Sequence, residues 1–539
     1  MSTTPISRRA ETGPRGAGLA GTLAAAFVVA WTATAAAQAP SPGELRIVFP
    51  SMWNEGLEPI LASSSGSIGL AAMYDDLVGT KADGTDYDRT TGLAEDWSLS
   101  ADGKAWTIRI RPGVQFHRGF GEMTAEDVKY SIERITAERS VAQRKGYFRE
   151  RVGPVEIVDR YTVRIPAKGP PIPDLLADLS ALQGSTERFV VSKKAAEELG
   201  PDKFAINPVG SGPYRFAEHV GGQYIRLVAV DKHWRITPRF EAVRFMAVPE
   251  EETSIAMLGR GEADVAPIAR NNIARVKRQR GGDVVLWKGS ASLVVYLDDQ
   301  FVEKVPVHKA KVREALNLAI DRKTIAETLF EGYARPFGTY YTQSVVAEAV
   351  GHDWKKDLYL YDPAKAKALL AEAGYPNGFD MDFWVYPWIG VPEGPDMMLA
   401  IAGMWEKIGV RPNIQQTEYG VVRAKLLKGE IPGAAGFFVA PARPWQGVIG
   451  IYRVFMHSKG SFGHVKIPEL DALLDKASNT IDPAETKKLI DQAMTYVRQN
   501  HLAVPVVEVD QAFGITAKAK HWDVGFRPQN LNFDSLLAR

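Results

Sequence analysis

The chain has 539 residues, of which 45% are hydrophobic and 24% are charged. This length exceeds what one hydrophobic core can hold, so it predicts two or three domains, and the composition excludes a disordered or fibrous protein. Lys and Arg number 65 against 64 Asp and Glu, so no broad basic field exists and no nucleic-acid partner is expected. The absence of cysteine excludes disulfides, thiol chemistry and cysteine-ligated zinc.

Residues 1–37 have the organisation of an export signal. Three arginines precede a weakly apolar run over 19–37 that ends in small residues, and cleavage fits after Ala37 or, less well, after Ala39. A membrane anchor is the alternative, because the run is almost long enough to span a bilayer. Its many Ala and Thr residues favour the cleaved signal. The route of export, Sec or twin-arginine, stays open.

The first strong structural pattern is a β-hairpin followed by a helix. Polar and apolar residues alternate over 97–99 and again over 106–110, around a turn at Asp102-Gly103. Thr124, with Asp127 three residues later, has the spacing of a helix cap, and apolar residues then recur at helical intervals. These residues predict a hairpin with one buried face and a capped amphipathic helix.

The order of residues in this stretch resembles the signature of family 5 extracytoplasmic solute-binding proteins. The matching strings are 94–97 (AEDW), 102–103 (DG), 111–117 (RPGVQFH) and 124–128 (TAEDV). Members of that family serve ABC importers for dipeptides, oligopeptides, nickel complexes and other solutes. The resemblance implies an α/β, periplasmic-binding-protein-like two-lobe hinge fold with an additional α+β domain. It also implies a small-molecule or short-peptide ligand, held between closing lobes, and the transmembrane subunits of an ABC permease as partners.

The resemblance divides the mature chain into three parts. Residues 44–63, 207–289 and 503–539 would form a discontinuous lobe I, 64–206 the additional domain, and 290–502 lobe II. The patterns along the chain agree with α/β lobes. Strands are expected at 45–49, 155–158, 161–165 and 243–248, helices at 251–261, 312–320, from Asp362 to Gly374 and from Asp482, and a crossing between the lobes at 504–509.

One glycine-rich segment, Asn207–Phe216, invites a phosphate-loop or nucleophile interpretation. It has no Gly-Lys-Ser/Thr, and Gly-x-Ser-x-Gly occurs nowhere in the chain. The family has a near-identical segment that forms a structural turn leading into a strand. We expect that role here.

No arrangement of residues predicts catalysis. Enzymes need paired groups, such as a nucleophile with a base or a metal with an open position. There is no His-Glu-x-x-His, the nine histidines are scattered, and His457 with His464 is a poor metal pair. We therefore expect no catalytic residue, no metal and no cofactor. A secreted hydrolase with unrecognised spacing is the remaining alternative.

The segment 436–444 (GFFVAPARP) departs from the family pattern. In peptide-binding relatives the corresponding segment resembles Gly-Trp-x-Ala-Asp-Tyr-Pro-Asp-Pro, and its first Asp pairs with the α-ammonium group of the peptide. Here the two Asp positions are Ala440 and Arg443. A desolvated ammonium without its counter-ion loses several kcal/mol. We therefore predict a solute other than a free-amine peptide, and peptide uptake with the ammonium partner elsewhere is the alternative.

Aromatic residues gather around the expected cleft. Ligand pockets are mostly apolar with a few aimed polar groups, and Arg443 could bind a carboxylate or phosphate or else face solvent. Core packing explains some of the aromatic residues equally well. The predicted ligand-binding residues are Trp53, Tyr386, Trp388, Phe438, Arg443 and Trp445.

The expected location is the periplasm. The chain lacks the lipidated cysteine that tethers many relatives in bacteria without an outer membrane. A soluble monomer confined by a second membrane is the expectation.

Overall fold

The computed structural model of the chain describes residues 43–52, 56–62, 67–82, 84–182, 186–340, 342–388, 390–433, 435–441, 444–524 and 533–538. These residues all belong to one unit that begins at Pro42. The predicted signal segment 1–37 and two predicted site residues, Trp53 and Arg443, lie outside the described residues. Within the described part, no helix is both long enough and apolar enough to cross a membrane.

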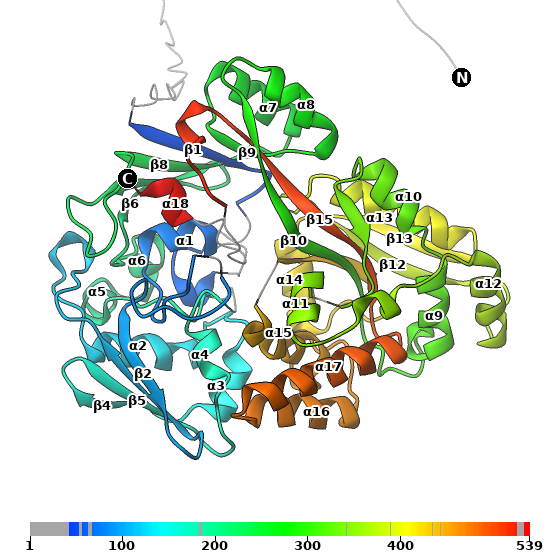
Figure 1. The fold of residues 1–539 in the computed structure, drawn as a ribbon, viewed down its shortest axis with the longest axis horizontal. Coiled ribbons are helices and arrows are strands. Elements are labelled where there is room, and N and C mark those ends of the chain that lie inside the picture. The colour runs from blue at the N-terminus through cyan, green and yellow to red at the C-terminus, as the bar shows by residue number, and fades with distance from the viewer. Residues whose placement is uncertain are drawn as a thin grey trace, which may run out of the picture. The chain divides into compact units, whose positions relative to one another are not determined.

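Within the described residues, eleven strands form one mixed sheet, and two long strands, β10 and β15, run side by side through its middle (Figure 1). Its order is β13-β12-β14-β10-β15-β9-β1-β8-β7-β6, and β11 pairs with β15 beside this path. The strands are β1 (Glu44–Phe49), β6 (Tyr214–Val220), β7 (Tyr224–Ala229), β8 (Ala242–Ala247), β9 (Val265–Pro267), β10 (Asp283–Leu297), β11 (Ala334–Pro336), β12 (Phe379–Val385), β13 (Val410–Gln416), β14 (Ala435–Pro441) and β15 (Val504–Ile515).

Parallel pairing occurs at both ends of this sheet. β1 pairs in parallel with β8 and β9, and β12 pairs in parallel with β13 and β14. β10 is antiparallel to both of its neighbours, β14 and β15. Because the carboxyl ends of parallel strands meet at one edge of a sheet, the loops that follow β9 and β12 are candidates for a binding site.

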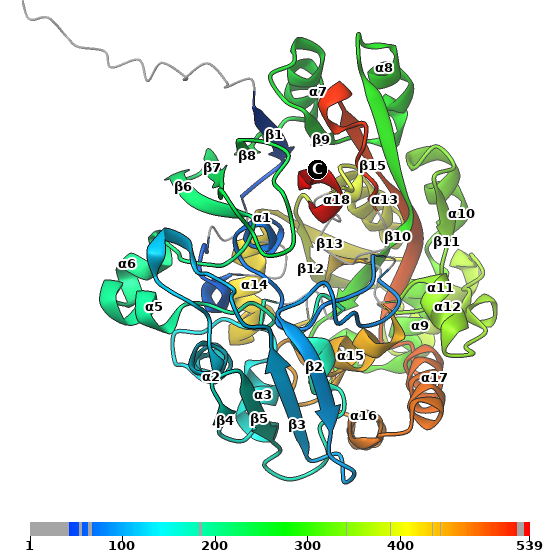
Figure 2. The same cartoon turned by 60° about the vertical axis from the view of Figure 1, so that its left-hand side comes forward.

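A second, antiparallel sheet contains the predicted hairpins (Figure 2). Its order is β2 (Ala94–Leu99), β3 (Ala105–Ile110), β5 (Thr162–Pro166) and β4 (Glu156–Asp159). Helix α2 (Ala125–Glu133) begins as predicted: the Asp127 carboxylate accepts from the Thr124 backbone N–H at 2.9 Å, and the Thr124 hydroxyl accepts from the Glu126 N–H. The hairpins and the capped helix are confirmed.

Two further helices begin at predicted positions. Asp362 and Asp482 each accept a backbone N–H at 2.8 Å and so cap the helices that begin at Pro363 and Pro483. The other helices are α1 (Ser67–Met73), α3 (Lys145–Arg151), α4 (Leu175–Asp178), α5 (Lys193–Leu199), α6 (Pro201–Ile206), α7 (Glu251–Arg260), α8 (Ile273–Arg278), α9 (Ala310–Leu318), α10 (Arg322–Thr324), α11 (Ser344–Ala349), α12 (Pro363–Glu372), α13 (Gly394–Glu406), α14 (Tyr419–Lys428), α15 (Val448–Met456), α16 (Pro468–Asn479), α17 (Pro483–Gln499) and α18 (Phe533–Leu537).

The buried apolar side chains form two large clusters, here called the first and the second core. The first core includes buried residues from 45 to 287 and again from 513 to 537. The second core includes buried residues from 291 to 509. A small third cluster packs around α7 and α8. Strands β10 and β15 therefore each begin in one large core and end in the other. The domain limits expected from the sequence stay a prediction.

Candidate functional site

The pairing of β10 with β15 is interrupted where the two strands pass between the cores. Three residues of β10, 288–290, lie opposite the single residue Asp510 of β15. Polar groups fill this gap: the Asp510 carboxylate accepts from the Gly289 N–H at 2.6 Å, and the Ser290 hydroxyl donates to the Gln511 side chain at 3.1 Å. An irregularity of this kind raises local twist and bends a strand pair. This gap, here called the hinge, is therefore a candidate for the place where one core rotates against the other.

A buried ion pair lies beside this gap and joins the two halves of the chain. Arg270 follows β9, and Glu393 precedes α13, after the loop that follows β12. The Arg270 guanidinium donates to the Glu393 carboxylate at 2.5 Å, to the Gly390 carbonyl at 2.9 Å and to the Asp510 carbonyl at 3.0 Å. The Arg270 side chain is 0% exposed and that of Glu393 is 7% exposed. Arg270 therefore links the loop after β12 to β15.

Burial dominates the electrostatics of this pair. Burial lowers the pKa of Arg270, although Glu393 opposes the change. Burial likewise raises the pKa of Glu393 against the effect of Arg270. Both shifts favour the neutral forms, so the loss of hydration outweighs the mutual attraction of the two charges. A buried pair of this kind holds a geometry and adds little net stability, but it is costly to break.

The predicted residue Trp388 lies in the same loop as Gly390, between the two cores. It is half-buried and packs against apolar residues of both the first and the second core. Its ring meets that of Tyr419 edge-on, with centroids 4.6 Å apart, and Tyr386 lies 6.4 Å away. Tyr386 itself is only 1% exposed and belongs to the second core. Of these rings, Trp388 is the one in contact with both cores.

The other predicted site residues lie farther along the chain. Trp445 begins a short 3₁₀ turn (Trp445–Gly447) before α15, is half-buried, and has the Lys487 ammonium 5.1 Å from its ring centroid. The backbone of Phe438 pairs with Val294 of β10, so Phe438 lies on the strand next to the hinge. The structure thus puts Trp388 in contact with both cores and Phe438 beside β10, whereas Trp445 packs against the second core alone.

A polar seam also links the hairpin region of the first core to helices α14–α16 of the second. These segments lie next to each other in Figure 1, where α4 is near α15. The hydrogen bonds of the seam are Arg151 to the Asn479 side chain (2.5 Å), Ser478 to the Asp174 carboxylate (3.0 Å), Ser461 to the Gln143 carbonyl (2.7 Å) and Arg423 to the Val141 carbonyl (2.8 Å). The two halves therefore meet at the seam as well as at the hinge.

A buried cluster of charges lies behind the seam. The Arg144 guanidinium donates to both oxygens of Asp178, at 2.9 and 3.0 Å, and reaches the Gly450 carbonyl of α15 at 3.4 Å. Burial raises the pKa of Asp178 to about 7, although Arg144 opposes that shift. The charge on this carboxylate therefore changes near neutral pH, next to a contact between the two halves.

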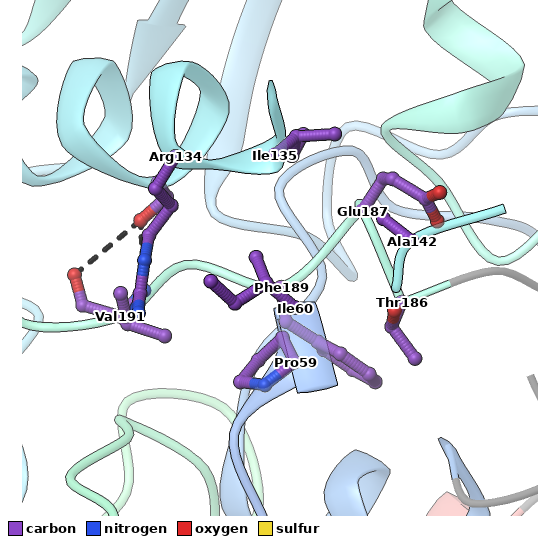
Figure 3. Close-up of a pocket in the computed structure, with 10 residues that line it drawn as sticks. Pro59, Ile60, Arg134, Ile135, Ala142, Thr186, Glu187, Phe189 and Val191 are labelled. Atoms are coloured by element: carbon purple, nitrogen blue, oxygen red, sulfur yellow. Dashed lines mark hydrogen bonds between the residues drawn. The ribbon is translucent and has the colours of Figure 1, made fainter. Parts of the chain in front are cut away.

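One small cavity is too small to be the solute site (Figure 3). It measures about 10 Å³ and is lined by Pro59, Ile60, Phe189 and neighbours. Arg134 at its edge pairs with the buried Glu58. A space of this size holds one water molecule and no larger solute.

Sequence reasoning missed Arg270 and Glu393. Arg270 follows the short strand β9, and the rule that carboxyl ends of parallel strands meet at one edge could have identified it. Glu393 gave no such signal, because it lies 123 residues from its partner in a loop between prolines. In the described part of the chain, no group of three His, Asp or Glu residues is arranged to hold a metal ion.

Comparisons with known proteins identify the family. Residues 89–437 match the family of bacterial extracellular solute-binding proteins, family 5 (middle). The chain is 30% identical to heme-binding protein A of Haemophilus influenzae over 476 residues, which cover 83% of each chain. It is also 30% identical to the dipeptide-binding protein of Escherichia coli over 429 residues, covering 75% of this chain and 76% of the relative.

Solved structures establish the two-lobe fold. The ABC transporter-associated periplasmic binding protein DppA of Helicobacter pylori, in complex with peptide STSA, superposes with a TM-score of 0.78 at 22% identity, over 91% of this chain and 97% of DppA. AgaA of Agrobacterium, in complex with agropinic acid, superposes with a TM-score of 0.78 at 22% identity, over 92% and 98% of the two chains. The chain therefore belongs to family 5 of the bacterial extracellular solute-binding proteins, the solute receptors of ABC importers.

Proposed function

We propose that this receptor works in the periplasm as a monomer and performs no chemistry on its solute. In the proposal, 44–63, 207–289 and 503–539 form lobe I, 290–502 form lobe II, and 64–206 form the additional domain. The lobes close over the solute, and the permease subunits recognise the closed form. The observation that carries the proposal is the interrupted pairing of β10 with β15 between the two cores.

Closure needs a solute that contacts both lobes. A ligand shifts a two-state equilibrium only through its different affinity for the two states. Contacts made with one lobe alone are the same in the open and closed forms, so they cannot favour closure. Trp388 meets this requirement on the protein side, because it already packs against both cores.

Binding of the proposed solute does not depend on a free α-ammonium group. Ala440 lies on β14, where its backbone pairs with Ser292 of the hinge strand β10, close to the interrupted ladder. An Asp at the corresponding position of peptide-binding relatives pairs with that ammonium. Alanine offers no counter-ion, so burial of an ammonium here would be unfavourable by several kcal/mol.

The proposed pocket consists of aromatic residues with one cation. Trp53, Trp388, Phe438 and Trp445 would supply apolar contact area, and Arg443 would bind a carboxylate or phosphate group in two-point fashion. Tyr386 would support the Trp388 ring by packing against it. The solved relatives hold solutes as different as peptide STSA and agropinic acid, so the fold alone does not select the solute.

The first experiment identifies the solute directly. Mass spectrometry of molecules that co-purify with the exported protein should reveal a small compound, recovered unchanged after binding. Small-angle scattering should then show a more compact envelope with that compound. An unchanged envelope across a broad nutrient library, with no thermal stabilisation by any compound, would contradict the proposal, as would recovery of a converted product.

The second experiment tests the missing counter-ion. Calorimetry with di- to pentapeptides should show weak binding to the wild type, and Ala440→Asp should raise the affinity for free-amine peptides about tenfold or more, as expected for a charged pair. Ala440→Asn is the matched control, because it adds similar volume without charge. Strong wild-type binding that depends on a free amine would overturn the solute argument.

A further inference from the structure

A second cavity, of about 660 Å³, lies between the loop that follows the first hairpin and strands β6 and β7. Its lining includes Arg118, Arg215, Lys232, His117 and Trp234. None of the residues described at the hinge or at Trp388 lines it. Sites for small molecules have volumes of roughly 300–1,000 Å³, so this cavity has the size of a ligand site.

The charge of this cavity is predominantly positive. Arg118, Arg215 and Lys232 line it, against one acidic lining residue, Asp231. In the described part of the chain, the side chains of Arg215 and Lys232 form no ion pair or hydrogen bond, although the Arg215 backbone pairs with Val228 in the sheet, and both residues are exposed. Burial lowers the pKa of Arg118, and the neighbouring Arg215 lowers it further. The cations therefore repel one another, and a bound anion would relieve that repulsion.

Arg118 is held in place by its backbone and by three hydrogen bonds. Its guanidinium donates to the Asn207 side chain at 2.8 Å and to the carbonyls of Asn207 and Pro208 at 3.0 and 3.2 Å. These acceptors are neutral, so they orient the guanidinium without cancelling its charge. Its φ of 57° lies in the left-handed region, which costs a non-glycine residue roughly 1–2 kcal/mol. Strain of this kind is retained where a side chain must be positioned.

The buried groups next to the cavity leave one acceptor open. The His117 ring donates through Nε2 to the Gly212 carbonyl at 2.8 Å, and its Nδ1 is buried with no partner among the described residues. The nearby buried carboxylate of Asp75 already accepts from Ser211, His233 and Trp234, at 2.8–3.2 Å. Asp75 is thus saturated with donors, whereas His117 can still accept one hydrogen bond.

We propose that this cavity is a second binding site, separate from the solute cleft, which takes a small anion with at least two phosphate or carboxylate groups. Arg215 would bind the anionic oxygens with a pair of hydrogen bonds, Arg118 would donate through its remaining N–H groups, and Lys232 would act as a point charge. A hydroxyl or protonated oxygen of the same ligand would donate to His117 Nδ1. The ligand class follows from this combination of three cations and one open acceptor.

The test uses the mature full-length protein with pyrophosphate and with citrate as probes. Each is titrated against sodium chloride of equal ionic strength, and binding is followed by the thermal midpoint and by tryptophan fluorescence. Trp234 lines the cavity and stacks under Arg111 at 4.6 Å, so Trp234→Phe should remove the fluorescence change. Binding of pyrophosphate alone identifies a phosphate ligand, and binding of citrate alone identifies a carboxylate ligand.

The decisive variant is Arg215→Gln with Lys232→Gln. Both side chains are exposed and unpartnered within the described structure, so the double variant should fold normally and bind the probe at least about tenfold more weakly. The matched control, Arg280→Gln with Lys277→Gln, removes the same charge from exposed positions in α8 and just after it. It should bind the probe as the wild type does. Equal affinity in wild type and double variant, an equal loss in the control, or no stabilisation by either probe would overturn the proposal.

Discussion

Replacing Glu393 by Gln tests the role of the buried ion pair beside the hinge. Gln keeps the shape of the side chain but removes its charge, so the Arg270 guanidinium is left buried and uncompensated. Its remaining acceptors are all neutral: the backbone carbonyl oxygens of Gly390 and Asp510 and the amide oxygen of the new side chain. Breaking one partner of a buried pair costs about 3–5 kcal/mol. We expect Glu393→Gln to destabilise the protein by this amount.

The expected change is measurable by calorimetry. An unfolding entropy of about 2.1 cal/mol/K per residue gives about 1 kcal/mol/K for a chain of this length, so the loss corresponds to a midpoint lower by about 3–5 °C. Removing both charges, in Arg270→Met with Glu393→Gln, should recover most of the stability, because burial already opposes both charged forms.

The control for this experiment is an exposed ion pair. Arg411 and Asp380 are 2.7 Å apart with side chains 55% and 79% exposed, and Asp380→Asn should cost no more than about 1 kcal/mol. A shift of less than about 1 °C for Glu393→Gln, or a double variant less stable than the single one, would refute the reasoning.

Four further outcomes follow from the same structure. Asn479→Ala removes the acceptor of Arg151 across the seam and should weaken solute binding by about 0.5–1.5 kcal/mol in calorimetry; unchanged affinity would mean that the seam is irrelevant to closure. Burial lowers the pKa of His117 to about 4, so on acidification the imidazole is protonated in the unfolded chain before it is protonated in the folded one. The free energy of unfolding should therefore fall by about 3 kcal/mol as the pH drops from 6.5 to 4, and His117→Gln should remove this pH dependence in urea titrations. The pKa of Asp178 is raised to about 7, so the folded protein keeps the Asp178 carboxyl protonated at pH values where the unfolded chain has lost that proton. The stability that this proton contributes should be lost as the pH rises from 4 to 7, and the same pH dependence of stability in Asp178→Asn would be inconsistent with this assignment. Trp388→Phe should abolish most of the fluorescence change on solute binding, and an undiminished change would place the reporter elsewhere.

The parts of the fold with local signals could be predicted from the sequence. The hairpin turn at Asp102-Gly103 and the caps at Thr124, Asp362 and Asp482 each depend on residues within a few positions of one another, and each is present as predicted. The two-lobe fold was predicted from the resemblance of residues 94–128 to the family signature.

The site was less accessible to sequence reasoning, because its contacts are long-range. Alternation along 384–388 could not decide which ring faces the core, and the structure buries Tyr386 while leaving Trp388 between the cores. The pairing of Arg270 with Glu393 depends on how two parallel sheet ends come together, which no local pattern encodes. Trp53, Tyr386, Trp388, Phe438, Arg443 and Trp445 remain predictions as ligand contacts.

The paired strands β10 and β15 constrain how the backbone behaves during transport. The two strands pair again on both sides of residues 288–290, with one further register shift between Leu293 and Val294, so motion at 288–290 can proceed without breaking the flanking hydrogen bonds. Amide protons along most of the two strands should therefore exchange with deuterium slowly in both states. Faster exchange is expected at the two register irregularities, except at Gly289, whose proton is held by the Asp510 carboxylate. Each import cycle would then leave the protein's most protected backbone intact, and the receptor could be reused many times without partial unfolding.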